Sequence, residues 1–384
     1  MLELIGGILI GIFILVLLVV GHDVGHAIVA RRKGVVVEEV GVGFPPRAWA
    51  KKLKNGILLT LNWLPLGGFV KLQGEYDSAS NKGDYGAASF WQKTKILLAG
   101  VSMNFIVAVV LFTILALTGL PKALPDQFSV PSDTTILIQP VEISSVAKDS
   151  IAEKAGLEKG DKVSSFAGET IDSSSELSQL IKNKQGETVD IVYVRDGNSY
   201  TKTISIGMAT DQSQGRIGIS MYQRELIRAT WSAPVVGIAT AGQFTIATLQ
   251  GLGNLLVDTF SGLFLQFSPD SNTRAEAQKD LQAAGDSVAG PIGILGTIFP
   301  AASSSGLTQL VFLTAIISLT LAVMNILPIP ALDGGRWFTM AIFKIMKKPL
   351  TKSREEKIQS VGVVVLLTLI LVITVLDVTK LFKQ

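Results

Sequence analysis

Residues 4–33 read LIGGILIGIFILVLLVVGHDVGHAIVARRK, an apolar run that leads into two histidines and a basic triplet. The apolar part, residues 4–21, is long enough to cross the hydrocarbon core of a bilayer as a helix, which takes about 20 residues. Glu3 is the only early charge and no small-residue cleavage site follows, so we interpret the run as a retained first span rather than a signal peptide. The basic residues 31–33 place its end on the cytoplasmic side by the positive-inside rule.

The overall composition is typical of a membrane protein that has a water-exposed part. Hydrophobic residues make up 48% of the chain and charged residues only 17%. The 34 basic and 31 acidic residues nearly balance, so the charge gives no reason to expect a nucleic-acid partner. Cysteine is absent, which excludes disulfides, thiolate metal sites and a cysteine nucleophile. Any metal must therefore be held by nitrogen and oxygen.

His22 and His26 are the only histidines of the chain, and they stand four residues apart. On a helix this spacing directs both imidazoles to one point, which is the geometry that a zinc ion needs from its first two ligands. The alternative is two unrelated histidines on one helix face.

Asp23 occupies the position that the catalytic glutamate takes in the zinc-peptidase pattern His-Glu-x-x-His. That carboxylate takes a proton from the attacking water and later delivers it to the leaving amine. Aspartate has a similar unperturbed pKa but reaches roughly 1 Å less far. A misplacement of that size can cost about a hundredfold in rate. The alternative for Asp23 is a solvated carboxylate at a helix end.

A third metal ligand is expected on the same face of the membrane, and Asp333 is the candidate. It lies in NILPIPALDGG, residues 325–335, where two prolines break the helix and two glycines allow close backbone approach. Asp333 could instead cap a helix at 336–346. Asn325 lies inside an apolar segment, where it could orient a ligand, hold a substrate backbone or join helices.

Three further spans are predicted, at 96–117, 309–328 and 360–378. We expect the apolar segment 232–266 to be an interfacial, amphipathic helix, because a crossing there would put Asp333 on the face opposite the histidines. Four polar residues interrupt this segment: Gln243, Gln250, Asn254 and Asp258. Four spans place all the candidate groups on one side.

Two regions between the spans have a β character. Near the membrane, the stretch 41–46 breaks the chain, and residues 57–61 and 68–72 predict a hairpin that its basic residues keep on the cytoplasmic side. From about 125 to 222 the charges are mixed in sign, as in a soluble domain. This part contains predicted strands at 135–139, 189–194 and 200–206 and a predicted helix at 172–182.

These residues together resemble the site-2 family of intramembrane zinc metalloproteases, in particular its bacterial RseP-like branch (the regulator of sigma-E protease type). The similarity covers most of the chain in the family's order. It rests on five segments: the motif at 22–26, the hairpin region 43–75, a PDZ signature at 155–161 that closes at Arg216-Ile217-Gly218-Ile219, Gly290-Pro291-Ile292-Gly293-Ile294, and the long motif at 325–335.

The resemblance implies a polytopic α-helical membrane protein with four transmembrane helices, a membrane-associated β-hairpin and one inserted α+β PDZ domain. The implied parts are an N-terminal membrane half at 1–124, the PDZ domain at 125–222, an interfacial helical segment at 223–307 and a C-terminal membrane half at 308–384.

The resemblance also implies a reaction and a place in the cell. Zinc is held by His22, His26 and Asp333, the residue at position 23 is the general base, and Asn325 contacts the unwound substrate. Substrates are single-span proteins, such as anti-sigma factors trimmed by an earlier external cut, or remnant signal peptides. The implied location is the bacterial inner membrane, with the PDZ domain outside as a size filter or peptide sensor.

The aspartate at position 23 leaves a second hypothesis open. A proteolytically inactive relative would bind membrane helices and peptides as a scaffold or chaperone. A metal transporter fits less well, because its polar groups should line a path across the bilayer, whereas here they gather at one face.

Overall fold

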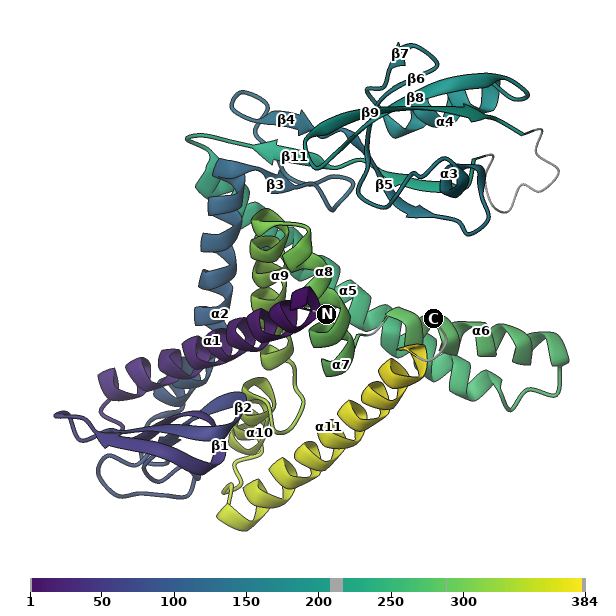
Figure 1. The fold of residues 1–384 in the computed structure, drawn as a ribbon. Helices are drawn as coiled ribbons and strands as arrows, with labels where there is room; N and C mark the ends of the chain where they lie inside the picture. Colours follow the sequence, from purple (N-terminus) through teal and green to yellow (C-terminus); the bar gives the residue numbers. More distant parts are fainter. Residues whose placement is uncertain (1, 208–216, 288, 382–384) are drawn as a thin grey trace. The chain divides into compact units, whose positions relative to one another are not determined.

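The computed structural model describes residues 2–207, 217–287 and 289–381 of the chain (Figure 1). These residues form two compact units, one built from Met1–Ala116 and Ala233–Gln384 and the other from Leu117–Ser232. The predicted closing residue Arg216 lies outside the described ranges.

Five of the described helices are long and apolar enough to cross a membrane, as is typical of a multi-pass membrane protein. They are α1 (Leu2–Arg32), α2 (Phe90–Thr118), α5 (Ala233–Leu265), α9 (Leu307–Ile326) and α11 (Lys352–Leu381). Four agree with the predicted spans, and the predicted total of four is not confirmed, because α5 is a fifth candidate.

Helix α5 covers the segment that we expected to lie in the membrane interface, and it is continuous over 33 residues. The four polar residues that interrupt its sequence are separated by seven, four and four positions, so they fall on one side of the helix. The other positions of the helix carry apolar residues, glycines, threonines and one serine, and none of them is charged or an amide. By length and composition α5 is therefore a candidate span with one polar stripe.

Helix α1 is longer than the predicted first span and continues through both histidines to Arg32. Its first turns pack closely against α8 (Phe299–Ser304), where the ring of Phe299 is fully buried. A Cβ added at Gly11 would lie 2.7 Å from that ring, so glycine permits this approach. The preceding residues form α6 (Ser271–Ser287), α7 (Pro291–Gly293) and a π-helical turn (Ile294–Ile298).

The region near the membrane contains two long antiparallel strands, β1 (Val37–Lys52) and β2 (Leu58–Leu72). The stretch 41–46, which we predicted as a break, is part of β1. Residues 58–61 pair both with 39–42 and with 49–52, whereas 68–72 pair only with 37–42 among the pairings of the described residues. Residues 68–72 are therefore an edge of this sheet.

The unit at Leu117–Ser232 contains two sheets. The larger has the strand order β10-β5-β6-β8-β9, with β7 attached to β6, and the smaller has the order β3-β11-β4. The strands are β3 (Leu120–Pro121), β4 (Thr135–Ile138), β5 (Val141–Val146), β6 (Lys162–Phe166), β7 (Glu169–Thr170), β8 (Thr188–Arg195), β9 (Asn198–Ser205), β10 (Ile219–Tyr222) and β11 (Glu225–Arg228).

Two helices belong to this unit, α3 (Ile151–Lys154) and α4 (Ser174–Asn183), and each is capped by a serine at its start. The core is apolar and includes Ile143, Phe166 and Ile191, all fully buried. The predicted PDZ signature follows α3 and ends at Asp161, which is buried and accepts a hydrogen bond of 2.6 Å from Nε of Arg195.

Candidate metal centre

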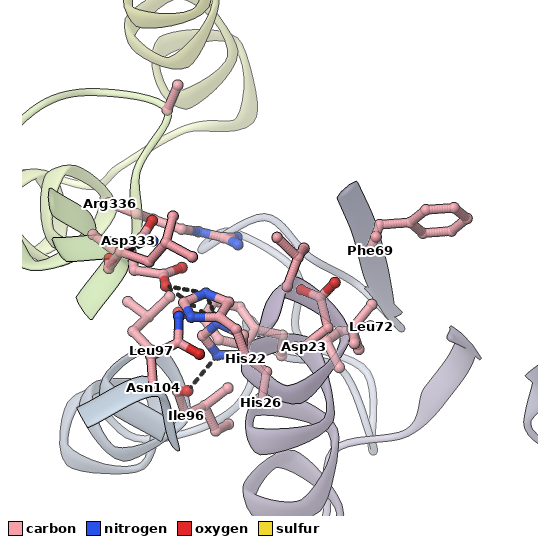
Figure 2. Close-up of a pocket in the computed structure, with 17 residues that line it drawn as sticks. His22, Asp23, His26, Phe69, Leu72, Ile96, Leu97, Asn104, Asp333 and Arg336 are labelled. Atoms are coloured by element: carbon pink, nitrogen blue, oxygen red, sulfur yellow. Dashed lines mark hydrogen bonds and ion pairs between the residues drawn. The ribbon is translucent and has the colours of Figure 1, made fainter. Parts of the chain in front are cut away.

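The two histidines lie one turn apart on α1, and their imidazoles meet beside the first residue of α10 (Asp333–Ile345), as Figure 2 shows. The Nε2 atoms of His22 and His26 are 3.1 Å apart. Oδ2 of Asp333 lies 3.1 Å from Nε2 of His22 and 3.2 Å from Nε2 of His26. The structure therefore brings together the three residues that the sequence suggests as ligands.

This triangle has the dimensions that a zinc ion requires. Bonds of about 2.0–2.1 Å in a tetrahedral arrangement separate neighbouring ligand atoms by about 3.3 Å. Oδ2 of Asp333 is buried and has no hydrogen-bond partner among the described residues. Two imidazole nitrogens and a carboxylate that converge in this way are the donor set of an open, three-ligand zinc site. These residues fit the metal.

The orientation of His26 is fixed from α2. Nδ1 of His26 donates a hydrogen bond of 2.7 Å to the backbone carbonyl of Ile96. An imidazole whose Nδ1 carries the proton presents the lone pair of Nε2, which is the atom that faces the triangle. Nδ1 of His22 is also buried but has no partner among the described residues.

Glycine allows α1 and α2 to approach at this point. A Cβ added at Gly100 would lie 2.6 Å from Cε1 of His22 and would also overlap Nε2 of His26. A Cβ at Gly25 would lie 2.8 Å from the carbonyl oxygen of Ala99. Since real Cβ contacts do not come this close, a larger residue at either position would separate the helices.

The chain between α9 and α10 places Asp333. Leu327 is extended and Ala331 has a φ of 79°, so the motif leaves the helix and turns back. The backbone N–H of Ala331 donates a 2.6 Å hydrogen bond to Oε1 of Gln359 on α11. Asp333 is the first residue of α10 rather than its N-cap, which is Leu332. Its carboxylate is therefore not engaged as a helix cap.

Arg336 follows Asp333 by one turn and anchors α10. Its guanidinium donates to the backbone carbonyl of Glu75, lies 3.2 Å from Oε1 of Glu355, and stacks 4.5 Å above the ring centre of Tyr85. Burial raises the pKa of the Tyr85 hydroxyl, so this ring is neutral. The contacts join α10 to α11 and to the loop after β2.

Glu355 extends this polar cluster to the rest of the loop. It is only 4% exposed, and its Oε2 accepts a 2.9 Å hydrogen bond from the backbone N–H of Asp77. Asp77 in turn forms an ion pair with Lys93 of α2, which is buried. Every charge of this buried cluster thus has a partner, as buried charges require.

Asp23 borders the metal centre from the side of the sheet. Its Oδ2 is buried and lacks a hydrogen-bond partner among the described residues. A Cβ added at Gly68 of β2 would lie 2.6 Å from that oxygen. In Figure 2 the carboxylate is turned toward the strand that carries Phe69. The side chain of Asp23, which is shorter than that of glutamate, therefore lies beside the sheet edge and outside the triangle of His22, His26 and Asp333.

A cavity of about 390 Å³ opens onto these groups. Asn325 lines it, and its Nδ2 donates a 2.9 Å hydrogen bond to the carbonyl of Leu321 in its own helix. The wall is shared by α1, β2, α2, α9 and α10, and it includes Val19, Gly68, Phe69, Val70, Leu72, Ile96, Leu97, Asn104, Leu321, Asn325 and Arg336.

Several of these groups were not identified from the sequence. The carbonyl of Ile96 and the glycine at position 100 carry no distinctive side chain, so no motif reveals them. Asn104 is a polar residue inside an apolar span, and the rule that singled out Asn325 applies equally to it. Arg336 could have been noticed as a charge one turn after Asp333.

Comparison with known proteins shows the family to which the chain belongs. The sequence profile described as Peptidase family M50 matches residues 10–369. The zinc metalloprotease RasP of Bacillus licheniformis is 26% identical over 448 aligned residues, which cover 95% of this chain and 97% of that protein. The regulator of sigma-W protease RasP of Bacillus subtilis is 25% identical over 446 residues, covering 95% and 96%.

Among solved structures, a PDZ domain of an SdrC-like protein from Listeria monocytogenes is 30% identical over 21% of this chain and 86% of that one. Its TM-score is 0.19, a similarity too low to define the fold. The family match is far more extensive. Because it spans residues 10–369, the protein belongs to Peptidase family M50, the site-2 proteases.

Proposed function

We propose that this protein is an intramembrane zinc metalloprotease that cleaves single-span membrane proteins after an earlier external cut. The observation that supports this most directly is the triangle of His22, His26 and Asp333, with edges of 3.1–3.2 Å, beside an apolar helix. A peptide bond that enters this cavity is removed from bulk water.

The three ligands and Asp23 divide the chemistry. When it is bound, zinc supplies a Lewis acid that polarises the peptide carbonyl and lowers the pKa of water. The water oxygen bonds to the carbonyl carbon, and Asp23 accepts the proton that this water releases. When the C–N bond breaks, Asp23 returns the proton to the nitrogen of the leaving amine. Asn325 holds the backbone of the unwound substrate.

A transmembrane helix must unwind before its peptide bonds become accessible, and the sheet offers it replacement hydrogen bonds. Residues 68–72 form an edge of the sheet, and Phe69 and Val70 of this edge line the cavity. An extended substrate segment can add to such an edge as a further strand. Backbone groups that would otherwise be unpaired in an apolar medium are then satisfied.

The charge pattern supports the proposed location in the bacterial inner membrane. Basic residues 31–33 lie at and just after the end of α1, which favours a cytoplasmic position for the metal centre and an extracytoplasmic position for 125–222. We assign 125–222 to a PDZ domain that binds a peptide or excludes substrates with a bulky outer domain. Deletion of 125–222 should admit uncut substrates, and unchanged rejection of them would contradict this role.

The protease function is tested with the purified full chain and a single-span substrate, comparing the protein with Asp23→Glu and His22→Ala. We expect specific products from the protein, more from Asp23→Glu, and none from His22→Ala. Cleavage that persists in His22→Ala would exclude the proposed centre.

The position of Asp23 favours one alternative, an inactive relative that binds membrane helices as a scaffold or chaperone. Its carboxylate lies against Gly68, and the residue is one methylene shorter than glutamate. Cleavage by Asp23→Glu alone would identify Asp23 as the disabling residue. No cleavage by either form, together with binding of the substrate, would support the scaffold.

A further inference from the structure

One side of α2 faces the metal centre along three successive turns. Ile96, Gly100 and Asn104 are spaced four residues apart, so they share one side of the helix. The carbonyl of Ile96 orients His26, and Gly100 contacts both imidazoles. Asn104 lies one turn beyond Gly100, about 6 Å further along the helix axis. The first two turns already have a role at the centre, and Asn104 continues the same side.

The amide of Asn104 is buried in a way that requires an explanation. The residue is 1% exposed, and its Oδ1 has no hydrogen-bond partner among the described residues. An unsatisfied buried polar group costs about 1–3 kcal/mol, which makes such groups rare outside functional sites. The backbone of Asn104 is held in place, because its carbonyl accepts a 2.8 Å hydrogen bond from Oγ of Ser318. The backbone of Asn104 is therefore fixed, while its side-chain amide remains able to bind a ligand.

The direction of this amide is toward the site. Asn104 lines the cavity of the metal centre, and in Figure 2 its side chain lies beside the histidine pair on the side away from Asp23. Asn325 lines the same cavity, but its Nδ2 is bonded to the carbonyl of Leu321. Of these two asparagines, Asn104 is the one whose amide has no hydrogen-bond partner among the described side chains and backbone.

We infer that Asn104 is a catalytic residue whose Nδ2 donates a hydrogen bond to the carbonyl oxygen of the peptide bond being cleaved. This inference rests on the proposed protease function. That oxygen gains negative charge as the carbonyl carbon becomes tetrahedral, and it loses the charge when the C–N bond breaks. A donor fixed before the reaction stabilises this charge without reorganisation. Asp23 on one side of the centre accepts the proton of the attacking water, and Asn104 on the other side donates a hydrogen bond to the carbonyl oxygen.

The test compares Asn104→Leu and Asn104→Asp with the unaltered full chain in detergent micelles. The probes are a fluorogenic leucine-rich helix of about 20 residues and a phosphinic peptide whose anionic oxygen mimics the charged carbonyl oxygen. Leucine has the same branched arrangement of side-chain heavy atoms as asparagine and removes the donor. Aspartate keeps the shape and places a negative charge where negative charge develops. Ser102→Ala, on an exposed side of α2, is the matched control.

We expect Asn104→Leu to lower kcat by about 100-fold or more, with KM changed by less than about threefold. Asn104→Asp should lower kcat further. Both should weaken binding of the phosphinic peptide at least about tenfold while zinc content stays unchanged, and Asn104→Leu should leave the thermal midpoint unchanged. A purely structural role predicts instead that the loss of kcat accompanies a loss of zinc or a fall in the thermal midpoint of Asn104→Leu.

Two results would overturn the assignment of Asn104. One is a kcat of Asn104→Leu within about threefold of the unaltered protein. The other is a loss of kcat that parallels a loss of zinc. If the unaltered, zinc-loaded protein neither cleaves the helix nor binds the phosphinic peptide, the protease function itself fails, and the role of Asn104 fails with it.

Discussion

Oδ2 of Asp333 lies 3.1 Å from Nε2 of His22, although the whole Leu117–Ser232 unit separates the two residues along the chain. The carboxylate has no other donor among the described residues. The negative charge of this carboxylate is therefore available to a cation. Whether the centre binds a metal should depend on the presence and the charge of the Asp333 side chain.

Replacing Asp333 should remove the metal. Asp333→Ala deletes the third ligand, and Asp333→Asn keeps its shape but not its charge, so both should weaken zinc binding by more than about 100-fold. Zinc per chain, measured by mass spectrometry after dialysis against a chelator buffer, checks this. Glu169→Gln, an exposed acidic position, is the control. Unchanged zinc content in Asp333→Ala would refute the third ligand.

Gly100 should be intolerant of even a methyl group. The Cβ of Gly100→Ala meets both imidazoles, so we expect zinc affinity to fall by about tenfold or more. This should occur although alanine favours the helix by about 1 kcal/mol relative to glycine. Gly21→Ala is the matched control, since a Cβ there has no atom within 4 Å. Equal zinc affinities of the two variants would show that α2 does not constrain the centre.

Replacing only one partner of the Arg336–Glu355 pair should lower the free energy of unfolding more than replacing both. Arg336→Met leaves Glu355 buried without its partner, which should lower the free energy of unfolding by about 3–5 kcal/mol. The double variant Arg336→Met, Glu355→Leu should recover part of this loss. Unfolding in detergent mixtures, arranged as a double-mutant cycle, measures the coupling. Additive effects would mean that the pair does not act as a unit.

The Leu117–Ser232 unit should lose stability in acid through Asp133. Partial desolvation acts to raise the pKa of this carboxyl, but hydrogen bonds from the hydroxyls and amides of Thr230 and Ser232 outweigh it and hold the pKa well below its ordinary value. A lowered folded-state pKa gives stability that is present above the unfolded pKa of about 3.9 and is lost as pH falls through the folded-state pKa.

Asp133→Asn should therefore destabilise this unit at pH 7 and have progressively less effect as the pH falls below about 4. Hydrogen exchange of the amides of Thr230 and Ser232 in the full chain follows the change. Asp172→Asn serves as the control, because the structure records no side-chain hydrogen bond of Asp172 to Thr230 or Ser232. A variant whose effect is the same at pH 7 and pH 3 would exclude titration of Asp133 as the cause.

The convergence of His22, His26 and Asp333 could be predicted because histidine and a carboxylate beside lipid have few structural uses. The four-residue spacing of His22 and His26 indicates a shared site, and the prolines and glycines around Asp333 indicate a carboxylate with a special backbone setting. Their supports could not be predicted, because the carbonyl of Ile96 is backbone and Gly100 acts by lacking a side chain. Which helix lies beside the histidines depends on tertiary packing, which local patterns do not encode.

The secondary structure, too, could be predicted from local patterns in some segments and not in others. The apolar runs predicted α1, α2, α9 and α11 well. The segment 232–266 was predicted to be interfacial from its four polar residues and from the topology that keeps Asp333 beside the histidines, whereas by length and composition α5 is also a candidate span. In the sheet, Gly41 and the prolines after Phe44 suggested a break, yet β1 continues through them because it pairs with two separate parts of β2.

The distribution of the three ligands along the chain has a consequence for biosynthesis. His22 and His26 leave the ribosome first, and Asp333 follows His26 by more than 300 residues. With Asp333 as the third ligand, a nascent chain cannot assemble the complete centre until Asp333 has been synthesised. Such a protease would stay inert during the insertion of its first membrane helices, beside the signal peptides and membrane helices that share its insertion machinery.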